Sequence, residues 1–79
     1  MNKKVLLENI DKIHTTKMGV ERVSKNLNIS CNIVEYIKNK ILDSKCYIYK
    51  NGKNWYCENG NIQITINAST YTIITAHLS

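Results

Sequence analysis

The chain has 79 residues, of which 43% are hydrophobic and 22% charged, within the usual range for a globular protein. A chain this short forms one domain with a small core, which excludes a multidomain enzyme built around a deep cofactor cleft. Eleven Lys and Arg residues against six Asp and Glu residues give a net charge of +5, which favours acidic partners such as nucleic acids. We therefore expect one domain over residues 1–79, with no cofactor.

The N-terminal sequence does not predict export or membrane insertion. The apolar run Val5–Leu7 is interrupted by Glu8, so it is too short for the core of a signal peptide or for a membrane span. Cys31, Cys46 and Cys57 show no C-x-x-C spacing, which argues against a zinc site and a disulfide framework. The sequence predicts a cytoplasmic protein with reduced thiols, no bound metal and no membrane association.

Residues 1–44 are predicted to form the helical half of the domain. Leu6, Ile10 and Ile13 recur at i, i+4 and i+7, which is the spacing of one buried helix face. His14 follows this stripe directly. We therefore expect a first helix that His14 closes at its C-terminal end.

Two further helices are predicted before the strands begin. Thr15–Thr16 can cap the second helix, and Ser30 is a good N-cap for the third. Asn28 stands between them at a position where a left-handed conformation would turn the chain. This pattern predicts a corner like that of a helix-turn-helix motif.

Residues 45–79 are predicted to form a β-meander. Asn51–Gly52 and Asn59–Gly60 are each the preferred two-residue loop of a type I′ hairpin. Taken at face value, these loops place Trp55 opposite Ile48 on one side and Ile64 on the other. The last strand spans Tyr71–His77, with a register left open by one residue.

The fold class that these elements predict is α+β. Three N-terminal helices, the second and third forming the helix-turn-helix-like corner, are expected to pack on a C-terminal four-stranded antiparallel meander. One sheet face is expected to form the core: Cys46, Ile48, Trp55, Cys57, Ile62, Ile64 and Ile66. The other face is expected to be solvated: Tyr47, Tyr49, Asn54, Tyr56, Glu58, Gln63, Thr65 and Asn67.

The third helix is a candidate reader of nucleic-acid bases. The predicted corner would project Asn32, Tyr36, Lys38 and Asn39 from that helix, where a helix-turn-helix protein places its base contacts. The same residues would also close an ordinary helical corner that binds nothing. Phosphate contacts are expected from five lysines: Lys25, Lys38, Lys40, Lys50 and Lys53.

The solvated sheet face is a second candidate binding surface. Tyr47, Tyr49 and Tyr56 are expected close together among amides such as Asn54, which is typical of a stacking surface for single-stranded nucleic acid. Tyrosine is equally frequent at protein interfaces. It also pairs across sheets for purely structural reasons. The three interpretations stay open.

The histidines allow a catalytic alternative. His14 and His77 could act as base and acid in metal-independent RNA cleavage, with Lys53 stabilising the developing negative charge. The other interpretation is a charge near a helix terminus for His14 and a chain end for His77.

Several stretches of the chain together carry a resemblance to a known family. They are His14–Thr16 with Gly19 and Arg22, Asn26–Leu27, Gly52–Tyr56, Asn67 and Tyr71–His77. In them the chain resembles a family of short bacterial proteins defined as a domain of unknown function. This resemblance implies a shared fold and supplies no activity. The final strand is also similar to the C-terminal strands of small toxin ribonucleases.

The leading prediction is a small basic binding module that acts on nucleic acid or on a complex that handles nucleic acid. The first alternative is a protein-binding inhibitor from a mobile element, of the anti-CRISPR type. The second alternative is a metal-independent ribonuclease of the toxin type.

Overall fold

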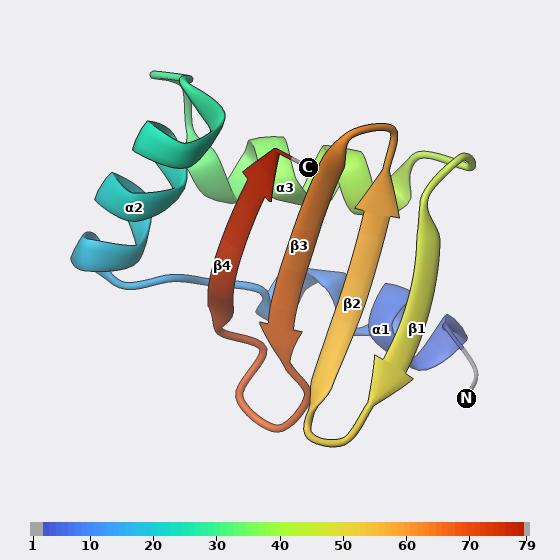
Figure 1. Cartoon of the computed structure of the whole chain (residues 1–79). Helices are drawn as coiled ribbons and strands as arrows, with labels where there is room; N and C mark the ends of the chain where they lie inside the picture. The colour runs from blue at the N-terminus through green and yellow to red at the C-terminus, as the bar shows by residue number, and fades with distance from the viewer. Residues whose placement is uncertain (1–2, 79) are drawn as a thin grey trace.

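The computed structural model describes residues 3–78 and shows a two-layer α+β domain, as predicted (Figure 1). Four antiparallel strands form one sheet in the order β1-β2-β3-β4. α1 and α3 lie behind the sheet, and α2 flanks β4. The elements are α1 (Lys4–Glu8), the 3-10 helix η1 (Ile10–Lys12), α2 (Lys17–Leu27), α3 (Ile33–Leu42), β1 (Tyr47–Asn51), β2 (Asn54–Asn59), β3 (Ile62–Asn67) and β4 (Ile73–Leu78).

The prediction that His14 closes the first helix is wrong. α1 ends at Glu8, and the side chain of Asn9 donates to the carbonyl of Val5 over 2.7 Å, a local bond that competes with helix propagation. His14 instead lies in an extended segment that pairs in parallel with Thr72 beside β4. Its backbone N–H donates to Tyr71 over 3.1 Å, and its carbonyl accepts from Ile73 over 2.8 Å. These long-range bonds take the place of a last helical turn.

The corner between α2 and α3 forms with one change from the prediction. Thr16 caps α2 by accepting from the N–H of Gly19 over 3.0 Å, and Asn28 adopts the left-handed conformation with φ 56° and ψ 49°. The N-cap of α3 is Asn32, which accepts from the N–H of Glu35 over 3.2 Å, so the assignment of that cap to Ser30 is wrong. Asn is as good a cap as Ser, so propensity alone did not separate the two positions.

Both predicted hairpin registers are wrong by two residues. Asn51 pairs with Asn54, so the first loop is Gly52–Lys53, and the second loop is Gly60–Asn61 by the same shift. Gly52 and Gly60 have φ of +64° and +61°, whereas Lys53 and Asn61 do not have positive φ. Positive φ at the first loop position alone is the pattern of a type II′ turn rather than type I′.

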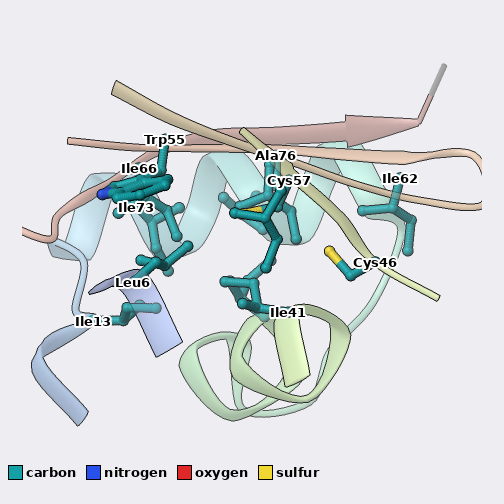
Figure 2. Close-up of a cluster of buried hydrophobic side chains, with 14 of the residues drawn as sticks. Leu6, Ile13, Ile41, Cys46, Trp55, Cys57, Ile62, Ile66, Ile73 and Ala76 are labelled. Carbon is teal, nitrogen blue, oxygen red and sulfur yellow. The ribbon is translucent and has the colours of Figure 1, made fainter. Parts of the chain in front are cut away.

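A shift of two residues leaves every side chain on its predicted face, because strand side chains alternate with period two. The predicted core face is buried in full: Cys46, Ile48, Trp55, Cys57, Ile62, Ile64 and Ile66. The neighbours of Trp55 change, however. It lies opposite Ile66 and Lys50 instead of Ile64 and Ile48. Figure 2 shows its ring beside Ile66 and Ile73 toward one end of the core.

A β-bulge settles the register of the last strand. Thr65 pairs with Thr75 and Ile66 with Ile73, so Ile74 is an extra residue in β4. Ile73 and Ala76 are consequently both buried although they are three residues apart, and Ile74 is exposed. The bulge therefore sets which residues at the end of β4 reach the solvated face.

Candidate interaction face

One face of the sheet points away from α1 and α3 (Figure 1). The strand register places three rows of side chains on it, each running across neighbouring strands. We call this surface the tyrosine face. The first row is Tyr47, Glu58, Gln63 and His77. The second row is Tyr49, Tyr56, Thr65 and Thr75. The third row is Asn51, Asn54 and Asn67.

The three tyrosines are packed against one another. The ring centroids of Tyr49 and Tyr56 are 5.4 Å apart with planes inclined by 19°, a stacked arrangement across β1 and β2. Tyr47 lies 5.3 Å from Tyr49 with an inclination of 39°. The side chain of Tyr47 is 64% exposed, whereas Tyr49 and Tyr56 are half-buried. The face thus offers a preassembled aromatic surface whose most accessible ring is Tyr47.

Polar contacts hold the tyrosines in place. The hydroxyl of Tyr49 donates to Oε2 of Glu58 over 3.2 Å, and Nδ2 of Asn54 donates to the hydroxyl of Tyr56 over 3.5 Å. Partial desolvation of the phenol, and then its hydrogen bond to Glu58, raises the pKa of Tyr49 above its ordinary value. Tyr49 therefore stays neutral, and its ring orientation is set by the sheet.

Charge is nearly absent from the tyrosine face. Glu58 is the one charged residue in its three rows. Lys50 lies opposite Trp55 and so belongs to the helix side of the sheet, while Lys53 lies in the β1–β2 turn. Lys25 belongs to α2, and Lys38 and Lys40 belong to α3. Of the five lysines that were expected to neutralise phosphates, four thus lie on helices or on the helix side of the sheet, and Lys53 lies in the turn at the end of the tyrosine face.

The third-helix residues are partly committed to contacts within the protein. The side-chain oxygen of Asn32 caps α3. Tyr36 packs against the core and has Nζ of Lys40 5.4 Å from its ring centroid. Asn39 is exposed and Lys38 half-buried. Two of the residues predicted to read bases are therefore engaged elsewhere.

The two histidines do not converge. Nδ1 of His14 donates to the carbonyl of Lys12 over 2.9 Å, and its Nε2 lies within hydrogen-bond distance, 3.1 Å, of the hydroxyl of Thr72. His77 lies opposite Gln63 on the tyrosine face. Thr72 precedes β4 directly and lies five positions before His77 along the chain, about 16 Å at roughly 3.3 Å per residue of extended backbone. The arrangement supplies no paired acid and base for RNA cleavage.

Three members of the tyrosine face escaped the sequence reasoning. Asn51 was assigned to the first hairpin loop, whereas it pairs with Asn54 as the last residue of β1. Thr75 and His77 reach this face because the bulge at Ile74 changes the side-chain parity of β4. Alternation alone could not assign them. The signal that would have assigned them is the apolar pair Ile73 and Ala76, which share a face only when a bulge lies between them.

The fold and the site define a class: a small two-layer α+β protein that exposes an aromatic, weakly charged sheet face. Over residues 7–77 the chain matches the family model described as protein of unknown function, DUF3781, and it belongs to that family. No curated protein and no solved structure matched the chain. Within residues 3–78, no helix has the length and apolar character needed to cross a bilayer.

Proposed function

We propose that this protein is a non-catalytic binding module that contacts a partner protein through the tyrosine face. The observation that carries the proposal is the packed set of Tyr47, Tyr49 and Tyr56 on a face that no helix in Figure 1 covers. Tyrosine offers a large contact area and a hydroxyl at a low cost in side-chain entropy. Aromatic anchors surrounded by amides and hydroxyls are typical of protein-recognition surfaces.

Charge favours a protein partner over nucleic acid on this face. Binding of a nucleic-acid strand requires cations beside the bases that stack, because phosphate neutralisation supplies most of the affinity. The tyrosine face has Glu58 in its first row, whereas Lys25, Lys38 and Lys40 lie on helices. A protein surface rich in amides and hydrogen-bond donors meets no such electrostatic obstacle.

Affinity capture from native lysate, with and without nuclease, tests the proposal. We expect the partner protein to remain bound after nuclease treatment. Tyr47→Ala should weaken its binding by about tenfold or more, the scale of a moderate hot spot. Because Tyr47 is 64% exposed, this change should leave folding intact.

Lys25→Ala combined with Lys38→Ala is the matched control on the helix layer. Under the protein-binding proposal this variant binds the partner like the wild type. Under the nucleic-acid alternative, nuclease abolishes capture and the lysine variant weakens binding. In that case log K should also fall with log salt at a slope of roughly −3 to −4 for about four neutralised phosphates. That set of results would overturn the proposal.

A further inference from the structure

Asn51 and Asn59 are the two asparagines of the chain that precede a glycine. Each is the last residue of its strand, and each opens a hairpin loop whose glycine has positive φ, +64° at Gly52 and +61° at Gly60. At both glycines nothing lies within 4 Å of the position that a Cβ would take. The two sites are therefore alike in sequence and in turn geometry, and they differ in what holds the asparagine side chain.

A glycine that follows an asparagine allows a reaction within the chain, because the absence of a Cβ lets the glycine nitrogen approach closely. This nitrogen attacks Cγ of the asparagine, and the side-chain nitrogen leaves as ammonia together with the proton of the glycine N–H. Water then opens the resulting succinimide at either carbonyl and leaves aspartate or isoaspartate. No reactant besides water is needed.

The contacts of Asn51 leave it free to react. Its side chain is exposed and makes no hydrogen bond with any other part of residues 3–78. The N–H of Gly52 makes no backbone hydrogen bond within that range either, while the N–H of Ala68 holds the far side of the turn by donating to the carbonyl of Lys53 over 2.8 Å. β1 is an edge strand, with β2 as its neighbour in the sheet. Rotation of the peptide between Asn51 and Gly52 therefore disturbs a single strand pairing, and local opening costs least at such margins.

The side chain of Asn59, by contrast, is tied to the helix layer. It is half-buried, and its Nδ2 donates to the carbonyl of Lys40 in α3 over 3.0 Å. It also approaches Asp43, whose pKa lies below its ordinary value because of hydrogen bonds from the N–H of Lys45 and then from Asn59. The strands that flank this loop, β2 and β3, both lie inside the sheet. Cγ of Asn59 must therefore leave these contacts before the nitrogen of Gly60 can reach it.

We propose that Asn51 is a site of spontaneous deamidation in the folded protein, and that its bond to α3 protects Asn59 from the same reaction. The product places a carboxylate on the tyrosine face, whose three rows otherwise carry the one charge of Glu58. The negative charge of this face therefore increases with the age of the molecule. This covalent change takes place whatever the tyrosine face binds, so it is independent of the proposed function.

Incubation of the full chain at mildly alkaline pH, followed by cleavage after Tyr49 and Trp55, tests the proposal. The cleavage puts the two asparagines into separate peptides, so mass spectrometry measures the conversion of each amide to an acid. We expect Asn51 to be converted at least about fivefold faster than Asn59, because one hydrogen bond that must first be broken slows a reaction by roughly that factor. Conversion of Asn59 that keeps pace with Asn51 would overturn the proposal.

The same incubation in urea isolates the contribution of the fold. In the unfolded chain neither side chain is held, so we expect the two rates to converge. A difference that persists in urea would show that neighbouring residues set it, which would overturn the protection of Asn59 by the structure. Conversion of both asparagines in urea and of neither in the folded chain would overturn the reactivity of Asn51.

Asn51→Gln and Asn59→Gln form a matched pair, because each keeps a side-chain amide and removes one of the two sites. Native ion-exchange chromatography should resolve a species whose net charge is one lower than the +5 of the unmodified chain. We expect this species to form in the wild type and in Asn59→Gln, and to be absent from Asn51→Gln over the same period. Its formation in Asn51→Gln at the wild-type rate would overturn the assignment of the site to Asn51.

Discussion

Tyr49 and Glu58 are joined across β1 and β2 by a hydrogen bond of 3.2 Å from the phenol to Oε2. The two residues belong to different rows of the tyrosine face, since Tyr49 pairs with Tyr56 and Glu58 pairs with Tyr47. The bond therefore connects the aromatic row to the row that contains the one charge of the face. It fixes the orientation of Tyr49 and, through the stack, that of Tyr56.

This bond predicts a pH dependence. The pKa of Tyr49 in the folded protein is raised by partial desolvation and by Glu58 above the ordinary value of 10.0. Between pH 10 and the folded pKa, the native protein keeps the phenol proton of Tyr49, whereas the unfolded chain has lost it. The contribution of this group to folding stability is therefore complete below pH 10 and is lost as pH rises through the folded pKa. Ultraviolet titration of tyrosinate should show a late-titrating component that is absent from Tyr49→Phe. Glu58→Gln should move that group toward the ordinary value, and an unchanged titration curve in this variant would exclude Glu58 as a cause.

The cap of α3 gives a second prediction. Asn32→Ala should lower the free energy of unfolding by about 1 kcal/mol, because it leaves the N–H of Glu35 without its acceptor. Ser30→Ala is the matched control and should change stability little, since Ser30 is exposed and lies outside the helix. Urea denaturation of both variants checks this. A larger loss of stability in Ser30→Ala than in Asn32→Ala would place the cap at Ser30.

Two adjacent threonines should respond to the same substitution with opposite signs. Oγ1 of Thr15 is buried without a hydrogen-bond partner among residues 3–78, so Thr15→Val should raise the free energy of unfolding by about 1 kcal/mol. Thr16→Val should lower it by about 1 kcal/mol, because the bond to the N–H of Gly19 is lost. Thermal unfolding of the pair measures both changes. A loss of stability in Thr15→Val would mean that its hydroxyl is satisfied.

Trp55 is the core residue whose loss should cost most. It is 2% exposed, and Trp55→Ala should lower the free energy of unfolding by about 3–5 kcal/mol, a large part of the stability of so small a domain. As the only tryptophan, it should also show blue-shifted emission that resists quenching in the native state. Tyr47→Ala, on the opposite face, is the control and should change stability much less. Solvent-like emission from the native protein would contradict this burial.

The hairpin loops can be tested at neighbouring positions. Gly52 has φ +64°, so Gly52→Ala should cost roughly 1–2 kcal/mol, the penalty of a left-handed conformation for a residue with a Cβ. Asn51 is a strand residue without positive φ, so Asn51→Val should be tolerated. A type I′ turn over Asn51–Gly52 would penalise both changes, and urea denaturation distinguishes the two cases.

The sequence by itself determined the fold class, the order of the elements and the faces of residues 47–49, 54–58 and 62–67 in β1, β2 and β3. Periods of 3.6 and 2 in the apolar residues carry that information, because burial of one face is a local requirement on each element. The three tyrosines of the candidate face were found in this way. The two glycines correctly marked where the chain reverses.

Tertiary structure decided the features that local periodicity leaves open, which are the strand registers, the bulge and the side of the sheet on which charges lie. A two-residue shift preserves alternation, so the choice between pairing Trp55 with Ile64 or with Ile66 depends on turn geometry and on packing against the rest of the core. The bulge at Ile74 and the pairing of His14 with Thr72 arise from contacts between segments distant in the chain. The separation of the lysines from the tyrosine face likewise follows from how the two layers stack, because charge counted along a chain does not specify the side of the sheet on which each residue lies.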